Sequence, residues 1–367
     1  MTYYLGLDVS QKQTALCLVD SKGTIVAEGK TMTNPMDILA WIKTKGFALT
    51  SIVRAGLEAG AMSSWLCTEL VKSGLNVMCL EAFQAYQFLK TQRNKTDKND
   101  ARGLAQLVRM GETFLKEIVI RSQCRQELRT LLTLRQQIVT QKVALENNIT
   151  GALKPFGLVT PRGRACQKTF HARVLETLRR AEERNIHVRE SMMLSLAVHE
   201  TQCQQLVNFN KRIMEAVRND PVCRRLMTAP GVGPIVACSF MTAVDDPKRF
   251  RGADDIGAYF GLTPRQYQSG ETDIRGPSSR RGNTMTRTHL VQAATTLLTG
   301  KKSSTLKAWG MKLARKKGFC KARIAVARTL AVILHKMWIN ETDFCWTTSQ
   351  EDKISPAAPA SAILQVS

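Results

Sequence analysis

The chain has 367 residues, 44% of them hydrophobic, and a formal net charge of +23 at pH 7 with a pI near 9.9. It holds no apolar run near the roughly 20 residues of a membrane span, and residues 1–20 lack the pattern of a signal peptide. We therefore expect a cytoplasmic protein with no membrane partner. Ten cysteines without any C-x-x-C pair, and five histidines without ligand spacing, favour reduced thiols over disulfides or zinc.

The positive charge increases along the chain. Residues 1–113 contain 13 basic and 10 acidic residues, 114–220 contain 18 and 10, and 221–346 contain 21 and 8. A protein this basic is expected to bind a polyanion, most commonly nucleic acid. The nearly balanced first block must have another role.

Residues 1–113 are expected to form a mixed α/β domain. Three β-rich runs at 3–9, 14–20 and 24–31 precede a helix at 35–45, a strand at 51–59, a helix at 61–73 and a strand at 75–81. An antiparallel meander followed by βαβ units is the element order of an RNase H-like (RuvC-like) domain.

Residues 114–220 are expected to form a helical coiled-coil arm. Apolar residues recur there at near-heptad spacing, at Leu131, Leu134, Ile138, Leu145 and Ile149. A Pro/Gly-containing stretch at 154–163 ends this pattern, and a second long helix is predicted from about 168 to 219, with or without interruption. An intramolecular hairpin and a dimer-forming coil both fit this pattern.

Residues 221–346 are expected to form a mainly helical C-terminal domain. Its segment PGVGP, 230–234, lies between helical stretches and is typical of a helix-hairpin-helix turn. The backbone N–H groups near Gly231 and Gly233 would there bind a DNA phosphate. Residues 347–367 are rich in Ser, Ala and Pro, and we expect a disordered tail.

Four carboxylates fall where an RNase H-like sheet would gather them. Asp8 ends the first strand, Glu58 ends the fourth, and Asp97 and Asp100 lie three apart at a helix start. Carboxylates brought together repel one another unless cations neutralise them, and oxygen ligands select Mg²⁺ or Mn²⁺. Two such ions about 3.5–4 Å apart can assist phosphoryl transfer. The neighbouring cations would then contact phosphates: Lys95, Lys98 and Arg102.

Each carboxylate also has a simpler explanation. Asp8 could cap the turn before Ser10, Glu58 could be a solvated strand end, and the aspartate pair could favour a helix N-terminus electrostatically. The opening LGLDVSQKQTALCLVD also resembles the first phosphate loop of actin-like kinases. That alternative requires a second phosphate loop and an adenosine loop, and the sequence contains neither.

Ser269 lies in a basic loop of the third block. A serine hydroxyl among arginines can be the nucleophile of phosphoryl transfer, with the arginines stabilising the developing charge. Composition alone also fits an ordinary loop serine. The arginines considered as nucleic-acid contacts are Arg265, Arg275, Arg280 and Arg281.

The ordered motifs GLDVS, GLEA, KTDKNDA, PGVGP, GLTPRQYQSGE and SSRRGN closely resemble the DEDD transposases of bridge-RNA-guided insertion sequences, a family that includes the pilin-gene DNA invertases. The resemblance covers about residues 3–340. It implies a metal-binding tetrad at Asp8, Glu58, Asp97 and Asp100 and a nucleophilic serine at Ser269. Ser278 and Ser279, in the neighbouring basic motif, are second choices; its Arg-Arg pair stands where Lys-Arg is frequent.

The resemblance further implies DNA recombination through a phosphoserine link, without an external energy source. A noncoding RNA encoded by the element would pair with donor and target DNA. Dimers would assemble into a tetramer, in which the RNase H-like domain of one subunit meets the serine domain of another. Two alternatives stay open: a metal-dependent junction nuclease that cuts with water, and a nonenzymatic nucleic-acid-binding protein with a degenerate RNase H-like domain.

Overall fold

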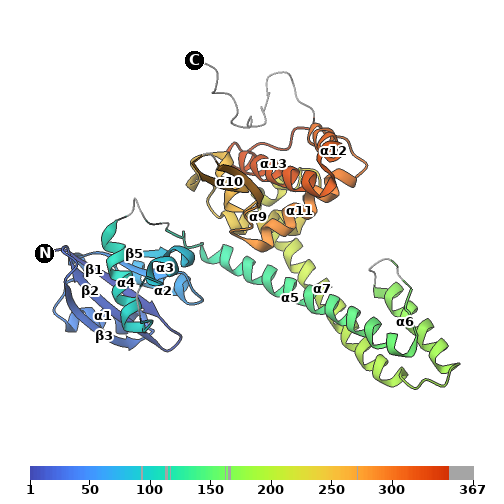
Figure 1. The fold of residues 1–367 in the computed structure, drawn as a ribbon, viewed down its shortest axis with the longest axis horizontal. Helices are drawn as coiled ribbons and strands as arrows, with labels where there is room; N and C mark the ends of the chain where they lie inside the picture. Colours follow the sequence, from blue (N-terminus) through green and yellow to red (C-terminus); the bar gives the residue numbers. More distant parts are fainter. Residues whose placement is uncertain are drawn as a thin grey trace, which may run out of the picture. The chain divides into compact units, whose positions relative to one another are not determined.

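The computed structural model describes residues 1–91, 94–111, 115, 117–161, 163, 167–270 and 272–346, without the side chains of Gln167, Ala253, Asp254 and Arg275. The chain divides into two compact units, Met1–Ser122 and Gln123–Ser367, and each is described by itself (Figure 1). The predicted tail at 347–367 lies outside the described residues.

The first unit is built on a five-stranded mixed sheet in the order β3-β2-β1-β4-β5. The strands are β1 (Tyr3–Val9), β2 (Gln13–Asp20), β3 (Ile25–Met32), β4 (Ile52–Glu58) and β5 (Val77–Leu80). The first three form an antiparallel meander, whereas β4 pairs parallel with both β1 and β5. The predicted mixed sheet is confirmed, and it is consistent with an RNase H-like domain.

Helices cover both faces of this sheet. The helices are α1 (Pro35–Thr44), α2 (Ser63–Lys72), α3 (Ala82–Leu89) and α4 (Asp97–Met110), with a 3₁₀ turn, η1, at Leu49–Ser51. Leu5 and Leu7 of β1 are buried with Ile38 of α1 and Leu66 of α2. On the opposite face Ala15, Cys17 and Val19 are buried against Ala101 and Ala105 of α4, as the period-2 alternation of a strand requires.

The segment after α4 returns to the sheet before the unit ends. The Ile118 N–H donates to the Cys79 carbonyl over 2.7 Å, and Ile118 and Ile120 pack against the core shared by the sheet, α1 and α2. The border between the compact units is therefore at Ser122, compared with the predicted division after residue 113.

The second unit begins with an arm of three helices: α5 (Gln123–Ala152), α6 (Gln167–Glu182) and α7 (Arg189–Asn219). A 3₁₀ turn, η2, at Lys154–Phe156 follows α5, and α5 packs along α7. The predicted second helix is interrupted at 183–188, where Asn185 adopts a left-handed φ of 56°. Of the predicted stripe, Ile149 is buried but Leu134 is 52% exposed, so the packed seam does not follow the whole stripe.

The far end of the arm has its own core with a polar centre. Ile149, Phe170 and Leu196 are among its buried apolar residues. His199, which is fully buried, lies 2.9 Å from Glu146 through Nε2 and 2.9 Å from His171 through Nδ1. This network joins α5, α6 and α7.

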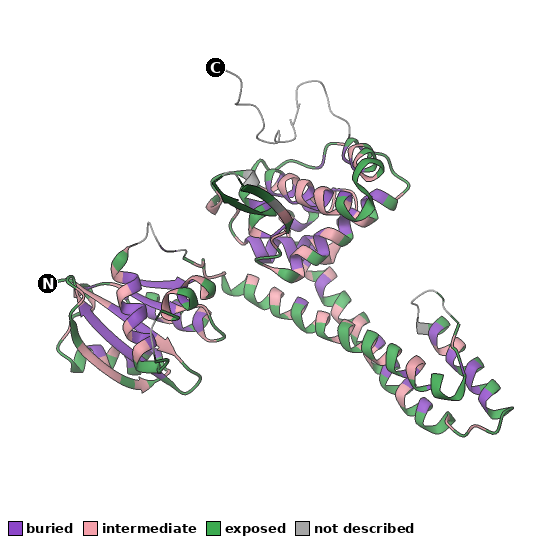
Figure 2. Cartoon of the chain, in the orientation of Figure 1, coloured by how far each residue is buried: buried purple, intermediate pink, exposed green. Residues whose placement is uncertain are grey.

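The rest of the second unit is a helical bundle with a β-hairpin. Its helices are α8 (Pro221–Leu226), α9 (Pro234–Val244), η3 (Pro247–Arg249), α10 (Ala253–Tyr259), α11 (Thr284–Thr299), α12 (Thr305–Lys317) and α13 (Phe319–Ile339). Buried residues concentrate in α9, α11 and α13 (Figure 2). Strands β6 (Pro264–Ser269) and β7 (Thr272–Ser278) form the hairpin, in a stretch for which the sequence predicted only a loop.

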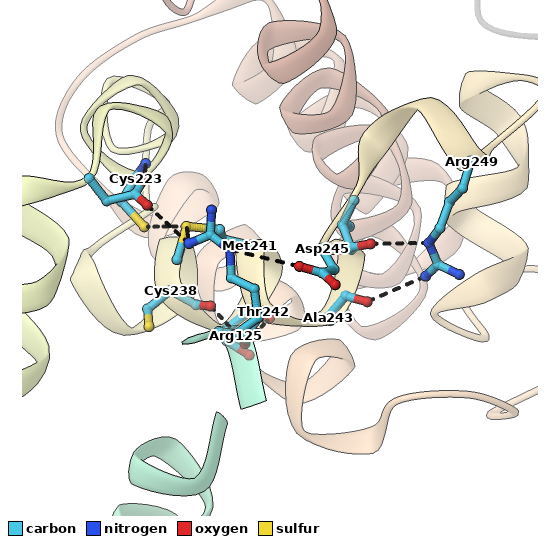
Figure 3. A network of polar contacts seen from close by, with 11 residues as sticks. Arg125, Cys223, Cys238, Met241, Thr242, Ala243, Asp245 and Arg249 are labelled. Atoms are coloured by element: carbon cyan, nitrogen blue, oxygen red, sulfur yellow. Dashed lines mark hydrogen bonds and ion pairs between the residues drawn. The ribbon is translucent and has the colours of Figure 1, made fainter. Parts of the chain in front are cut away.

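Arg125, in the first turn of α5, connects the arm to the bundle (Figure 3). Its guanidinium lies 3.0 Å from Asp220, between α7 and α8, and 3.9 Å from Asp245 at the end of α9. It also contacts the Met241 sulfur, and nearby Leu132 is buried in the bundle core. Among the described ranges, no helix is both long and apolar enough to cross a lipid bilayer.

Candidate active site

Two glycines allow α4 to lie directly on the sheet. Gly6 of β1 and Gly56 of β4 are register partners. A Cβ on Gly6 would lie 2.1 Å from the Ala101 carbonyl oxygen, and a Cβ on Gly56 would lie 2.1 Å from Val108 Cγ1. No larger residue fits at either position without displacing the helix, so the glycine pair fixes how closely α4 approaches the strand ends.

Asp8 and Glu58 come two residues after these glycines, so their side chains leave the sheet on the face that α4 covers. Partial burial is the main reason that the pKa of Asp8 is raised to about 6, and the negative charges of Asp100, Asp97 and Glu58 contribute in the same direction. Burial also raises the pKa of Glu58, and Asp100 contributes in the same direction. Three separated segments thus bring carboxylates within electrostatic range of one another.

The two aspartates of α4 differ in their surroundings. Asp100 is 8% exposed, whereas Asp97 is on the surface. Lys30 of β3 donates to Asp97 Oδ2 over 2.7 Å, and this bond lowers the pKa of Asp97. Thr96 caps the helix by accepting from the Asn99 N–H over 3.2 Å. Asp97 therefore begins the helix as predicted, but its carboxylate pairs with β3.

Glu28 of β3 holds the two nearest cations of α4. The Lys98 ammonium lies 3.0 Å from Glu28, and the Arg102 guanidinium donates to both Glu28 oxygens. The hydrogen bond from Arg102 is the main reason that the pKa of Glu28 is lowered to about 2. Lys95 lies close to the carboxylates, because its charge lowers the pKa of both Asp8 and Glu58. The sequence reading missed Glu28 and Lys30.

The donor set matches a hard divalent cation in kind, since carboxylate oxygens are the ligands that Mg²⁺ and Mn²⁺ prefer. The raised pKa of Asp8 reflects burial first and repulsion from the neighbouring carboxylates second, and a bound cation would relieve that repulsion. Within the described ranges, however, no three His, Cys, Asp or Glu side chains are arranged to hold a metal together. Asp97 is paired with Lys30 instead. The ligand assignment stays a prediction.

The PGVGP turn joins α8 to α9. Gly231 has a left-handed φ of 80°, and a Cβ there would lie 2.3 Å from the Ala293 carbonyl oxygen of α11. Gly233 is the N-cap of α9 without a side-chain cap, and Pro234 is the first helical residue. A cavity of about 520 Å³ beside the turn is also lined by Lys301 and Lys302. Uncapped N–H groups and nearby cations suit an anion.

Ser269 is the last residue of β6 and pairs with Thr272 of β7 across the hairpin end. It is exposed, and Gly270 follows with a left-handed φ of 55°. Its hydroxyl is thus presented at the tip of a hairpin. Arg265 donates to the Ser279 carbonyl over 3.4 Å at the hairpin base. Arg275 pairs with Gln266 through the strand register, and its side chain lies outside the described part.

The SSRRGN segment forms the turn between β7 and α11. The Ser279 N–H donates to the Thr263 carbonyl, and the Arg280 N–H to the Gly261 carbonyl. A Cβ on Gly261 would lie 2.1 Å from the Arg281 carbonyl oxygen, so the turn packs directly against the GLTP segment. Arg280 itself has a left-handed φ of 54°. Ser278, at the end of β7, lines a large basic cavity.

Arg287 of α11 is a further cation that the sequence reading missed. It donates to the carbonyls of Phe260 and Arg281, each over 3.2 Å, and so holds the SSRRGN turn against α10. Burial lowers its pKa, and the charge of Arg280 adds to the effect. Only the tertiary packing of α11 on this turn reveals it, because the sequence places Arg287 on an ordinary helix.

Two family models match successive parts of the chain. A DEDD_Tnp_IS110 model, described as transposase, matches residues 5–157, which include the four carboxylates. A model described as Transposase IS116/IS110/IS902 family matches residues 223–308, which include the PGVGP turn and Ser269. Fold and matches together define a transposase with an N-terminal DEDD domain. The chain belongs to the IS110/IS116 family of transposases.

Individual relatives agree with this assignment. The chain is 26% identical over 336 residues to the transposase for insertion sequence element IS1111A of Coxiella burnetii, covering 90% of this chain and 88% of that protein. It is 27% identical over 293 residues to a probable family 20 transposase of Pseudomonas aeruginosa, with coverages of 78% and 84%. It is 26% identical over 241 residues to the transposase for insertion sequence element IS1328 of Yersinia enterocolitica, with coverages of 65% and 69%.

Proposed function

We propose that this transposase is a site-specific DNA recombinase that cuts and rejoins DNA strands, with Mg²⁺ held by carboxylates and Ser269 as nucleophile. One observation carries the proposal: Asp8, Glu58 and Asp100 come from three separated segments, and burial together with the charges of the neighbouring carboxylates raises the pKa of Asp8 to about 6. A fold rarely gathers unpaired carboxylates unless a cation or a proton is to be held there.

Asp8, Glu58 and Asp100 would be the core ligands of Mg²⁺ or Mn²⁺. Asp97 would join them after giving up its ion pair with Lys30 for the cation. Water can reach this ion pair, because both side chains are about half exposed. When bound, the cation would stabilise negative charge on phosphate oxygens during phosphoryl transfer. Lys95, whose charge acts on both Asp8 and Glu58, would orient the phosphodiester beside the carboxylates.

Ser269 would start the exchange of strands. Its Oγ attacks a DNA phosphorus, the bond from phosphorus to one sugar oxygen breaks, and a phosphoserine diester forms. The serine proton passes to a base, and the departing sugar oxygen takes up a proton. Attack by another sugar hydroxyl on the phosphoserine restores a DNA phosphodiester and the free serine. One ester is exchanged for another at each step, so no external energy source is required.

The nucleic-acid partners in this proposal are donor DNA, target DNA and a guide RNA encoded by the element. The excess of basic residues in 221–346 supports binding of polyanions there. Guidance by RNA and assembly of dimers into a tetramer rest on the family resemblance. Sequencing the RNA that copurifies with the protein, and searching it for complementarity to DNA flanking the gene, tests the guide directly.

A suicide DNA substrate with a nick or mismatch tests the covalent step. The wild type should leave a protein–DNA adduct, which denaturing electrophoresis detects. Ser269→Ala should leave none while still binding DNA, and Ser279→Ala is the matched control that should retain the adduct. Free cleaved ends from Ser269→Ala would instead indicate a nuclease that cuts with water, and an adduct from Ser269→Ala would exclude this serine as nucleophile.

A further inference from the structure

The second unit contains a cavity of about 730 Å³ between α11, the first half of α13 and the base of the β6–β7 hairpin. Its volume lies within the range of pockets that hold small organic ligands. The cavity borders Ser278 and Arg280, yet most of its wall comes from residues to which the proposed chemistry assigns no role.

The charge of the cavity wall is entirely positive. Five cations line it, and no acidic residue does within the described part of the chain: Arg280, Arg287, Lys321, Arg323 and Arg328. Arg287 is held in place by hydrogen bonds to two carbonyls and to the Thr284 hydroxyl. Cations gathered on one wall are stabilised by a bound anion.

Two further features mark where an anion would lie. Arg323 Nε is buried and has no hydrogen-bond partner within the described ranges. An orphaned donor of this kind is costly unless a ligand accepts from it. The same wall includes Cys320 and Lys321 in the first turn of α13, whose N-cap, Gly318, makes no side-chain cap. The N–H groups of that turn lack intrahelical acceptors, so they add partial positive charge.

Much of the remaining wall is apolar. Leu262 and Pro264 contribute from the segment leading into β6, Pro277 from β7, Val291 from α11 and Ile324 from α13. Contacts to the backbone of a duplex require only exposed cations on a surface. A hollow with both an apolar wall and a cationic wall instead matches a ligand with one flat apolar part and one anionic part.

We propose that this cavity receives a single unpaired nucleotide of the bound nucleic acid, with its base against the apolar wall and its phosphate at Arg323 and the first turn of α13. Guanidinium planes such as that of Arg287 can stack on an extruded base. The inference rests on the proposed function, because the nucleotide belongs to the DNA or RNA on which the transposase acts.

Equilibrium binding to paired and bulged nucleic acids tests the cavity. Fluorescence anisotropy would compare a fully paired duplex with the same duplex carrying one unpaired nucleotide, in a DNA and in an RNA version, and would thereby show which polymer supplies the nucleotide. The wild type should bind at least one bulged version about tenfold more tightly than its paired counterpart, as expected for one captured base.

A variant that fills the cavity with a large side chain tests whether the nucleotide binds there. Thr288 is an exposed residue of α11 that lines the cavity, so Thr288→Trp adds volume without disturbing the core. It should abolish the preference for the bulge and leave affinity for the paired duplex unchanged, whereas Thr288→Ala should behave as wild type. Arg323→Gln should also reduce the preference, and Lys312→Gln, which removes a charge from α12 outside the cavity, should not.

The outcomes separate this inference from the proposed function. Equal affinity of the wild type for bulged and paired forms of both polymers, or an undiminished preference in Thr288→Trp, would refute the nucleotide cavity even if the Ser269 adduct forms. Loss of the Ser269 adduct together with an intact bulge preference would refute the recombinase chemistry alone. Melting temperatures of all variants show that each remains folded.

Discussion

Gly6 and Gly56 lie opposite each other on β1 and β4, and α4 crosses both of them at a distance that excludes any side chain. Asp8 and Glu58 follow these glycines by two residues, and Asp100 lies one residue before Ala101, whose carbonyl contacts Gly6. The close approach of the helix therefore sets the spacing of the carboxylates, and the packing of the core and the geometry of the site cannot be varied separately.

Gly6→Ala tests this coupling. A methyl group 2.1 Å from the Ala101 carbonyl forces α4 outward, and overpacking of this kind costs about 1–3 kcal/mol. We expect a lower free energy of unfolding for the first unit and weaker Mg²⁺ binding, measured by hydrogen exchange and calorimetric titration. Gly60→Ala is the control, because its Cβ meets nothing closer than 4.0 Å. Unchanged Mg²⁺ affinity in a folded Gly6→Ala protein would contradict the coupling.

Lys30→Gln tests the competition for Asp97. The substitution removes the ion pair that occupies the Asp97 carboxylate, so Mg²⁺ should bind up to about fivefold more tightly, as expected if an exposed ion pair contributes about 0.2–1 kcal/mol. Lys45→Gln, at the C-terminal end of α1, removes the same charge without affecting Asp97. A dissociation constant that falls equally in both variants would indicate a nonspecific charge effect.

His289 should make the second unit sensitive to acid. Burial, assisted by the charge of Arg135, lowers its pKa to about 4. The unfolded chain takes up the proton near pH 6.5 and the folded chain only near pH 4, so stability decreases as pH falls through this window, by about 3 kcal/mol in total. Hydrogen exchange of α11 at pH 7 and pH 4.5 measures the loss. The same pH dependence in His289→Leu would rule out this histidine as its source.

The polar centre of the arm should stabilise its far end. His199→Ala leaves Glu146 and His171 without their buried partner and opens a cavity, at a cost of about 2–4 kcal/mol. Amide exchange in α6 should accelerate, because α6 is attached to the arm largely through this core. His187→Ala, at an exposed position of the same arm, should change little. Equal exchange in both variants would show that the network does not hold α6.

Strands with one buried face were predictable from the sequence, and the β6–β7 hairpin was not. The run 3–9 contains apolar residues that are buried in the sheet, whereas every residue of β6 is exposed. No hydrophobic periodicity therefore indicates β6 in the sequence. The break between α6 and α7 was equally hidden, because it contains neither glycine nor proline and depends on the left-handed Asn185.

The site was predictable only in part, because some of its residues are brought together by tertiary structure and not by local sequence. A strand end or a helix start can be located from local sequence, and so Asp8, Glu58, Asp97 and Asp100 could be selected. Glu28 and Lys30, however, act on α4 only through the strand register that sets β3 two strands from β1. Residues that meet only through the pairing of distant strands cannot be recognised from the sequence around them.

The attachment of Arg125 to Asp220 and Met241 fixes where the arm leaves the bundle. With its first turns fixed in the bundle, α5 extends over 30 residues, a length of about 45 Å at 1.5 Å per residue. Any molecule held at the His199 end is thereby kept at a constant separation from the PGVGP turn. The arm therefore sets a fixed distance between its far end and the bundle.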